Sequence, residues 1–156
     1  MKKNQMQLTF DAKSVNESFA RVAVAAFLTE LNPTLDEIAD VKTAVSEAVT
    51  NAIIHAYESE EDQIYLSCRT CCDGKEKSLE IIIKDTGKGI ADVKKAMEPF
   101  YTTKPELERS GMGFAFMEAF MDELDVVSKV NEGTIITMKK YIGKQEETLC
   151  ENSQNL

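Results

Sequence analysis

Short stretches of alternating or continuous apolar residues along the chain predict β-strands. In a strand with one face against a core, every second side chain is apolar. The stretches cover residues 5–10, 63–72, 78–85, 125–130 and 134–141. Asp73-Gly74, a typical hairpin turn, joins the second stretch to the third, and Asn131-Glu132-Gly133 forms the turn between the last two.

Other segments repeat their apolar residues at helical spacing. The predicted helices cover residues 14–31 and 35–57, a short segment that ends near 97, and 111–124. Ser14 with Glu17, and Thr34 with Glu37, match the capping box that begins many helices. The order of these elements predicts an α+β fold, with a mixed, mostly antiparallel sheet and helices packed on one face.

Length and charge restrict the classes of protein to consider. The chain has 156 residues and a formal net charge of −9, which predicts one domain over residues 1–142 and a polar tail over 143–156. A strongly acidic chain is a poor match for phosphate backbones, so no nucleic-acid partner is expected. No apolar run approaches the ~20 residues of a membrane span, and no signal-peptide core follows the start. We therefore expect a cytoplasmic protein without membrane contact.

Cysteines offer no convincing metal site. Cys68, Cys71 and Cys72 are close together and Cys150 is distant, whereas structural zinc sites usually have two separated ligand pairs. We expect the three clustered thiols to lie in or beside a strand as small hydrophobic side chains.

The helix predicted over residues 35–57 has polar residues along the border of its apolar face. Glu47, Asn51 and His55 are spaced four residues apart and form a column on that border. A carboxylate and an amide placed there are half desolvated and can act on a ligand that lies against the helix. Spacing alone equally fits ordinary border residues of an amphipathic helix, and His55 equally fits a structural role.

Two glycine-containing segments add to this column. Asp85 ends an apolar strand, and Gly87 and Gly89 follow it, which lets the backbone approach a flat or charged ligand. Such glycines also occur in strand-to-helix turns for geometric reasons alone.

The second glycine segment begins a helix. Its residues are Ser110, Gly111, Met112, Gly113 and Phe114, and free N–H groups at a helix start can bind phosphate. Donors and cations precede it, namely Thr102, Thr103, Lys104 and Arg109.

In this order the segments resemble the Bergerat-fold ATPases, the superfamily that includes DNA gyrase, histidine kinases and MutL. Glu47–Ala56 is similar to their N-box, Asp85–Ile90 to the first glycine box and Gly111–Gly113 to the second. Glu98–Phe114 resembles more narrowly the ATP lid of the anti-sigma serine kinases of endospore-forming bacteria. The resemblance extends from Gln5 to Tyr141, and implies a Bergerat fold with a mobile ATP lid.

The resemblance implies a role for each matching position. Asp85 would accept a hydrogen bond from the adenine amino group, Asn51 would bind Mg²⁺, and Glu47 would be the general base. Lys104 and Arg109 would lie near the γ-phosphate. The implied nucleotide-binding residues are Asn51, His55, Asp85, Gly87, Gly89, Thr102, Thr103, Lys104, Arg109, Ser110, Gly111, Met112, Gly113 and Thr134. Ala56 departs from the pattern, because glycine is expected there.

The same resemblance implies a function with two parts. The protein would bind and inhibit a sporulation sigma factor, sigma F, and would use Mg²⁺ and ATP to phosphorylate a serine of an anti-anti-sigma factor, leaving ADP. A homodimer formed through the first strand and helix is also implied. Arg21, expected as an unpaired cation on that helix, is a candidate partner contact; a solvated arginine is the alternative.

Two other functions remain open at this point. A histidine-kinase ATP-binding domain would need an acceptor histidine on a separate upstream helix, and His55, inside the N-box, is the one histidine of this sequence. A regulatory module could bind nucleotide without transferring phosphate. Glu47 favours catalysis over such a module, because it provides a base for a hydroxyl nucleophile.

Overall fold

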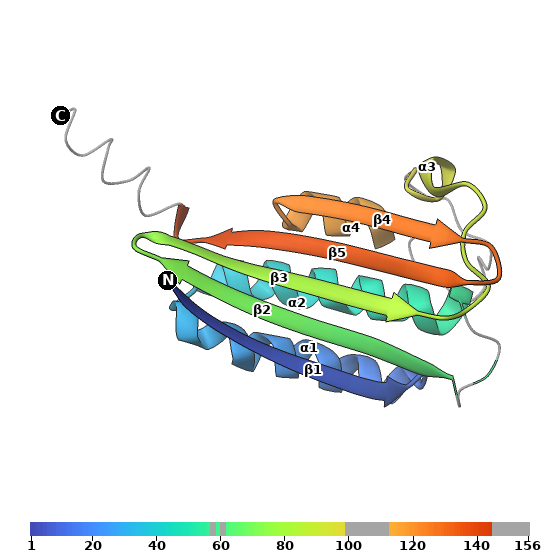
Figure 1. Cartoon of the computed structure of the whole chain (residues 1–156), viewed down its shortest axis with the longest axis horizontal. Helices are drawn as coiled ribbons and strands as arrows, with labels where there is room; N and C mark the ends of the chain where they lie inside the picture. The colour runs from blue at the N-terminus through green and yellow to red at the C-terminus, as the bar shows by residue number, and fades with distance from the viewer. Residues whose placement is uncertain (57–58, 60–61, 99–112, 145–156) are drawn as a thin grey trace.

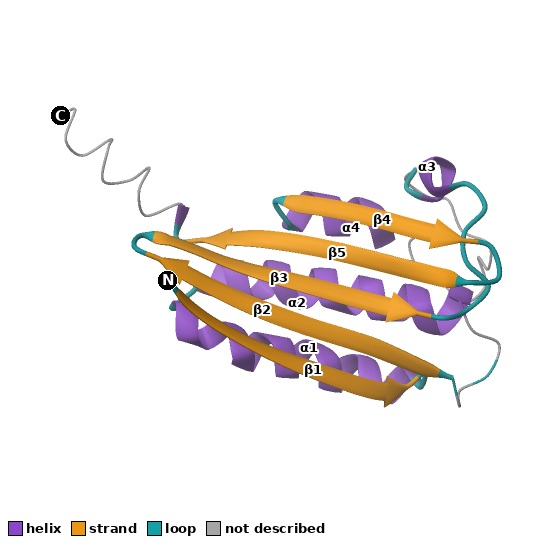
Figure 2. Cartoon of the chain, in the orientation of Figure 1, coloured by secondary structure: helices purple, strands orange, loops and turns teal. Residues whose placement is uncertain are grey.

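Five strands form one sheet, and helices cover one of its faces (Figures 1 and 2). The computed structural model describes residues 1–56, 59, 62–98 and 113–144. The strands are β1 (Lys2–Asp11), β2 (Gln63–Asp73), β3 (Glu76–Asp85), β4 (Glu123–Lys129) and β5 (Gly133–Ile142), in the order β1-β2-β3-β5-β4. Every neighbouring pair is antiparallel. The predicted α+β class is confirmed, but the described strands contain none of the parallel pairing expected of a mixed sheet.

The helices form the second layer behind the sheet. They are α1 (Ser14–Leu28), α2 (Leu35–Asn51) and α4 (Gly113–Phe120), while the short α3 (Val93–Ala96) lies beside the end of the edge strand β4 (Figure 1). A 3₁₀ turn, Thr29–Leu31, follows α1, and a π-helical turn, Ala52–Ala56, follows α2. Two consecutive helices between β1 and β2 return the chain to the end of the sheet where β1 finished, so β2 runs antiparallel to β1 (Figure 1).

A capping box begins α2, as predicted. Thr34 Oγ1 accepts from the Glu37 amide at 3.1 Å, and Glu37 Oε1 accepts from the Thr34 amide at 2.9 Å. Glu37 is buried, and its second oxygen accepts from the Gly143 amide at 2.9 Å. One carboxylate therefore satisfies the start of α2 and also ties it to the end of β5.

The capping box predicted for α1 is wrong. The N-cap of α1 is Lys13, which makes no side-chain cap, and Ser14 already lies inside the helix. The preceding turn is held by the Asp11 carbonyl, which accepts from the Lys13 amide and from Asn16 Nδ2. Glu17 is free to pair with Arg21 at 3.7 Å, so the expectation that Arg21 is unpaired is also wrong.

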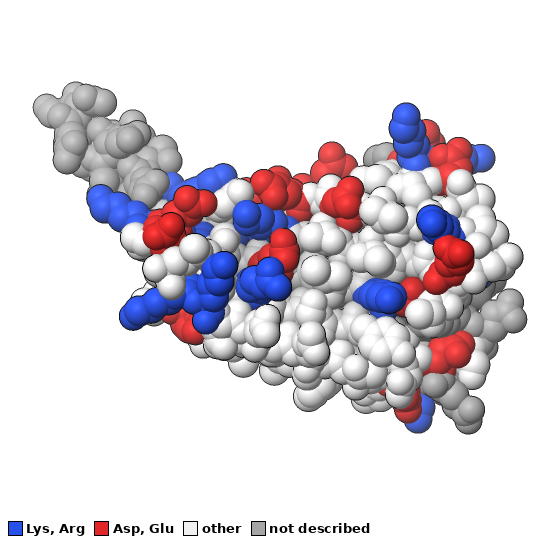
Figure 3. Space-filling view, viewed as in Figure 1, with Lys and Arg blue, Asp and Glu red and all other residues white. Residues whose placement is uncertain are grey.

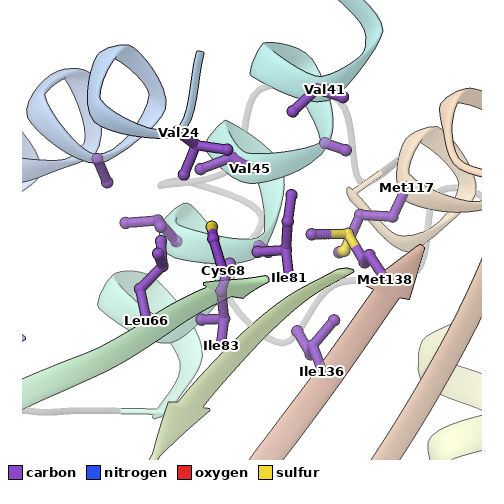
Figure 4. Close-up of a cluster of buried hydrophobic side chains, with 14 of the residues drawn as sticks. Val24, Val41, Val45, Leu66, Cys68, Ile81, Ile83, Met117, Ile136 and Met138 are labelled. Atoms are coloured by element: carbon purple, nitrogen blue, oxygen red, sulfur yellow. The ribbon is translucent and has the colours of Figure 1, made fainter. Parts of the chain in front are cut away.

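The core lies between the sheet and the helices (Figure 4). The apolar face predicted for α2 is buried and packs on the inward residues of the central strands; its fully buried members are Val41, Ala44, Val45, Ala48 and Val49. Cys68 is 2% exposed, and burial raises its pKa to about 12. It packs among Leu66, Ile81 and Ile83 as a small hydrophobic side chain, as predicted.

The other face of the sheet is open. Figure 3 shows this face, with charged side chains dense near the β2–β3 turn and sparse over the middle of the sheet. Tyr65, Val127 and Ile135 are exposed. None of the helices that the structure describes has both the length and the apolar character needed to cross a bilayer. Most of the predicted tail, residues 145–156, lies outside the described residues.

Candidate functional site

Four pieces of chain meet at one end of the molecule. The end of β3, the end of α2, the β4–β5 turn and the start of α4 all lie on the right in Figure 1. These pieces carry the described residues of the predicted site, so the fold gathers two groups of side chains that are far apart in sequence. The first group lies on α2 and α4, and the second lies around the end of β3.

Glu47, Asn51 and Gly113 form the first group. A Cβ added to Gly113 would lie 3.0 Å from Asn51 Oδ1, 3.2 Å from Asn51 Nδ2 and 3.4 Å from Glu47 Oε2. The first residue of α4 therefore lies directly against two of the three polar residues of the α2 column. Free N–H groups at the start of α4 and the oxygens of α2 thus border the same small region.

His55 occupies a different kind of turn. The helix predicted to continue to Tyr57 ends as α at Asn51, and His55 lies half-buried in the π-helical turn Ala52–Ala56. Single π turns are often found next to functional sites. The predicted α-helical column is confirmed for Glu47 and Asn51. It is wrong for His55, which lies in a π-helical turn and not in the α-helix. Tyr57 lies outside the described residues.

Asp85 is the centre of the second group. It is 6% exposed, at the end of β3, where Thr134 of β5 is its strand partner. Burial raises the pKa of the Asp85 carboxyl above its usual range, and hydrogen bonds from the Gly87 and Thr134 amides lower it in part. The Gly87 amide lies 3.0 Å from Asp85 Oδ1. The two amide hydrogen bonds offset the cost of burying this carboxylate only in part. Such a carboxylate is suited to accept a further hydrogen bond from an amine on a flat ligand.

Two glycines allow the loop after β3 to pack on the β4–β5 turn. Gly89 has φ +74°, and a Cβ there would overlap the Lys129 carbonyl. Gly133 has φ +112°, and a Cβ there would overlap the Asp85 carbonyl. Both positions have a left-handed backbone conformation and no room for a side chain, so only glycine fits them. Packing therefore explains the glycine at position 89 of the predicted glycine loop.

Ser128 belongs to this second group and was not predicted from the sequence. Its Oγ accepts from the Ile90 amide at 2.8 Å and lies 3.1 Å from the Gly133 carbonyl and 2.8 Å from Thr134 Oγ1. Ser128 thereby connects the glycine loop to the β4–β5 turn and to Thr134. In the sequence it is an ordinary polar residue of a strand, and only its nearness to Thr134 across a short turn offered a signal.

Most of the predicted lid falls outside the described residues. This applies to Thr102, Thr103, Lys104, Arg109, Ser110, Gly111 and Met112. Their contributions to phosphate binding stay predictions. Arg21 is described and lies on α1, which is separated from α4 by α2 (Figure 1), so it is not part of this site.

The donor atoms near Gly113 fit Mg²⁺ that is shared with a phosphate ligand. Within the described part of the chain, no three His, Cys, Asp or Glu side chains cluster as metal ligands. Mg²⁺ prefers oxygen ligands, keeps several waters, and is usually held by one or two protein side chains together with substrate phosphates. The amide oxygen of Asn51 and the carboxylate of Glu47, beside a helix start, match that arrangement.

Comparisons with known proteins show the family of this chain. Residues 8–140 match the histidine kinase-like ATPase domain family. The chain is 57% identical over 149 residues to the anti-sigma F factor of Heyndrickxia coagulans, covering 95% of this chain and 99% of that protein. It is 59% identical over 140 residues to the anti-sigma F factor of Clostridium botulinum (strain Alaska E43 / Type E3), covering 90% and 96%. The chain belongs to the anti-sigma F factor family.

A solved structure supports the fold of this anti-sigma F factor family member. The crystal structure of the RsbU and RsbW domains of Rv1364c from Mycobacterium tuberculosis aligns with a TM-score of 0.61 and 20% sequence identity. The alignment covers 88% of this chain and 32% of that one. Membership in a family of ATPase domains supports nucleotide binding, and the two groups of residues described above are the candidate positions for it.

Proposed function

We propose that this protein is an ATP-dependent serine kinase that also binds and inhibits a sporulation sigma factor, sigma F. Its phosphate acceptor would be a serine of an anti-anti-sigma factor. The observation that carries the proposal is that Gly113 faces both Glu47 and Asn51 so closely that a Cβ there would lie 3.0–3.4 Å from their side chains. It brings a candidate base and a candidate metal ligand to a helix start, which is where a phosphate group is favoured.

The base of the nucleotide is assigned to the end of β3. Asp85 would accept from the adenine amino group, while Gly87, Gly89 and Thr134 would shape the surrounding loop. The buried Asp85 carboxyl and its bonds to backbone amides support this assignment, because they hold the acceptor in one orientation. His55 would lie beside the nucleotide without taking part in the chemistry.

The phosphates are assigned to the start of α4. Asn51 would bind Mg²⁺, which when bound supplies positive charge to the phosphate oxygens. Gly113 and the preceding lid residues would donate to those oxygens, with Lys104 and Arg109 near the γ-phosphate. Phosphoryl transfer depends mainly on such positioning and charge stabilisation.

Glu47 is assigned as the general base. It would accept the proton of the acceptor serine while the serine oxygen bonds to the γ-phosphorus. The bond between that phosphorus and the oxygen bridging to the β-phosphate would break, and ADP would leave. A general base contributes on the order of 10²–10⁴-fold to rate. This role suits a hydroxyl nucleophile better than an imidazole, which favours a serine kinase over a histidine kinase.

The test is to incubate the protein with Mg-ATP and an anti-anti-sigma factor and to detect phosphoserine. Glu47→Ala is expected to lose transfer by ~10²-fold or more and to keep ATP binding. Nucleotide binding without any transfer by the unaltered protein would favour the regulatory module instead. Equal loss of transfer and binding in Glu47→Ala would mean that Glu47 is misassigned.

The partner surface is assigned to α1. This helix exposes Val15, Phe19 and Val22 on one side, and Arg21 lies on the same helix, half-buried beside Glu17. We assign Arg21 as a contact for the sigma factor, and the edge strand β1 together with α1 as the surface of a homodimer. A sigma factor would act with RNA polymerase inside the cell, so the proposed location is the cytoplasm.

Two measurements separate these assignments. Arg21→Ala is expected to weaken retention of the sigma factor without changing nucleotide affinity, and unchanged retention would remove Arg21 from the proposed surface. Phe19→Glu places a charge in the proposed dimer surface and is expected to give a monomer in sedimentation analysis. A dimer that survives this substitution would place the homodimer surface elsewhere.

A further inference from the structure

Lys140 is a buried lysine with no place in the site described above. Its residue is 8% exposed, at an inward position of β5. Its Nζ donates to the Phe120 carbonyl at 2.7 Å and lies 3.3 Å from Asp40 Oδ2. One ammonium group therefore connects β5, the last residue of α4 and the first half of α2. A buried charge is costly unless it is paired and hydrogen-bonded, so these contacts hold the three elements together.

The Phe120 carbonyl is a favourable partner because of where it lies. The last carbonyls of a helix lack an intrahelical donor, and the C-terminal end of the helix carries partial negative charge. A lysine that donates to this group satisfies it and also fixes the end of the helix. Asp40, on α2, is the counter-charge, so the position of α4 is set relative to α2 in particular.

The other end of the same helix is at the proposed phosphate site. α4 has 8 residues, about 12 Å in length, so it behaves as a short rigid rod. Gly113 at its start contacts Asn51 and Glu47 of α2, and Phe120 at its end is tied to Asp40 through Lys140. The two helices are thus joined at both ends of α4. A displacement at Phe120 would be transmitted to Gly113.

We propose that Lys140 is a positioning residue for the nucleotide phosphates. It acts through the Phe120 carbonyl, and holds the start of α4 at the distance from Asn51 and Glu47 that phosphate binding requires. This inference rests on the proposed assignment of the phosphates to the start of α4. It adds a residue that touches neither nucleotide nor metal but sets the geometry of the groups that do.

The proposal predicts which ligands are affected. Asp85, Gly89 and Ser128 build the adenine end from β3, the glycine loop and β4, without α4. Loss of the Lys140 contacts therefore weakens ligands in which phosphates contribute to binding and leaves adenosine unchanged. A purely structural role for Lys140 would lower stability and weaken ATP and adenosine by the same factor.

The experiment compares Lys140→Met with Glu37→Gln by calorimetric titration of Mg-ATP and adenosine. Glu37 is also a buried charged residue that links α2 to the end of β5, and its hydrogen bonds come from the Thr34 and Gly143 amides rather than from α4, so it is a matched control for lost stability. In Lys140→Met, ATP affinity is expected to fall by about 10-fold or more, because the start of α4 is no longer held against Asn51 and Glu47. Adenosine affinity is expected to change less than about 2-fold, and Glu37→Gln to leave the ratio of the two affinities as it was.

Further variants test whether a loss of ATP affinity in Lys140→Met comes from the lost hydrogen bond or from misfolding. Lys140→Arg can donate to the same carbonyl and is expected to restore most of the ATP affinity. The Asp122 side chain accepts from the Tyr141 amide at 2.7 Å and keeps the chain after α4 attached to β5, so Lys140→Met should still fold. If it does not, Asp40→Asn, which removes the counter-charge from a partly exposed position, should lower ATP affinity a few-fold and spare adenosine.

The outcomes distinguish the two proposals. The role of Lys140 would be overturned if folded Lys140→Met had the same ratio of ATP affinity to adenosine affinity as Glu37→Gln. Asp40→Asn takes its place in this comparison if Lys140→Met does not fold. Either result would leave the kinase assignment intact. If the unaltered protein binds adenosine and ATP equally, the assignment of phosphates to α4 fails, and the positioning role fails with it.

Discussion

Gly113 faces Asn51 across the interface between α4 and α2, where a Cβ on residue 113 would fit only tightly. A Cβ at position 113 would lie 3.0 Å from Asn51 Oδ1 and 3.2 Å from Asn51 Nδ2. The glycine is therefore favoured by packing and not by its backbone conformation, since its φ lies outside the left-handed region. This close contact brings the backbone of α4 next to the side chains assigned to metal binding and catalysis.

Gly113→Ala should separate stability from nucleotide binding. The methyl group displaces the Asn51 amide or the start of α4 by a few tenths of an ångström, and ATP affinity is expected to fall by about 10-fold. Stability should change by less than about 1 kcal/mol, because alanine favours the helix and offsets part of the strain. Calorimetric titration and urea unfolding measure the two quantities.

Gly74→Ala is the matched control for that substitution. Gly74 has φ +62° in the β2–β3 turn, and a Cβ there meets nothing within 4 Å. Alanine should cost about 1 kcal/mol of stability through backbone strain and leave ATP affinity unchanged. If Gly113→Ala also kept full ATP affinity, the contact with Asn51 would have no functional meaning.

Asp85→Asn should stabilise the nucleotide-free protein at neutral pH. Burial raises the pKa of Asp85 above 3.8, so the folded state holds its proton more tightly than the unfolded chain does. Its contribution therefore favours folding below pH 3.8 and is lost as the pH rises through the raised pKa. The gain in stability of Asp85→Asn over the unaltered protein, measured by urea unfolding, should appear between pH 3.8 and the raised pKa of Asp85. It should then stay constant to pH 7.

Nucleotide binding should change in the opposite sense. The Asp85→Asn amide replaces a charged acceptor by a neutral group, and ADP affinity at pH 7 is expected to fall by about 10-fold or more. A variant that is less stable than the unaltered protein at pH 7 would contradict the raised pKa. Unchanged ADP affinity would contradict the adenine assignment.

The apolar periodicity predicted most of the fold, because the buried face of each element is continuous in sequence. The periodicity misplaced the end of an element where apolar residues keep helical spacing beyond the end of the helix. Met117, Met121 and Leu124 keep helical spacing, so the predicted helix extends to Leu124, although α4 ends at Phe120 and β4 begins at Glu123. The Asp122 amide donates to the Lys139 carbonyl and begins the strand, a long-range contact that local periodicity does not contain.

Residue type and spacing drew attention to part of the candidate site, and tertiary contacts determine the rest. Glu47, Asn51 and Asp85 were singled out from their spacing and from the glycines after Asp85, and the resemblance to the Bergerat-fold ATPases supplied their proposed roles. Ser128 acquires its role only when β4 pairs with β5 and the glycine loop packs on their turn. Lys140 did leave a signal, because it occupies an inward position of a strand whose other inward residues include Ile136 and Met138.

Ser128→Ala should loosen the adenine end without touching the ligand. The substitution leaves the Ile90 amide and the Gly133 carbonyl without their side-chain partner. We expect a loss of about 1 kcal/mol in stability and a several-fold loss of ADP affinity. Ser67→Ala, at an outward position of β2 remote from this loop, is the control and should change neither. If Ser128→Ala binds ADP as well as the control does, Ser128 has no part in shaping the site.

Thr34 and Ser14 begin the same sequence pattern, yet only one of them caps a helix, so the two should respond differently to alanine. Thr34 Oγ1 accepts from the Glu37 amide, and Thr34→Ala is expected to cost about 1 kcal/mol, within a range of roughly 0.5–2. Ser14 lies within the first turn of α1 and caps nothing, so Ser14→Ala should change stability by less than about 0.5 kcal/mol. Urea unfolding of both variants measures the difference. Equal losses would mean that α1 is capped by Ser14 after all, and that Glu17 does not remain with Arg21 in solution.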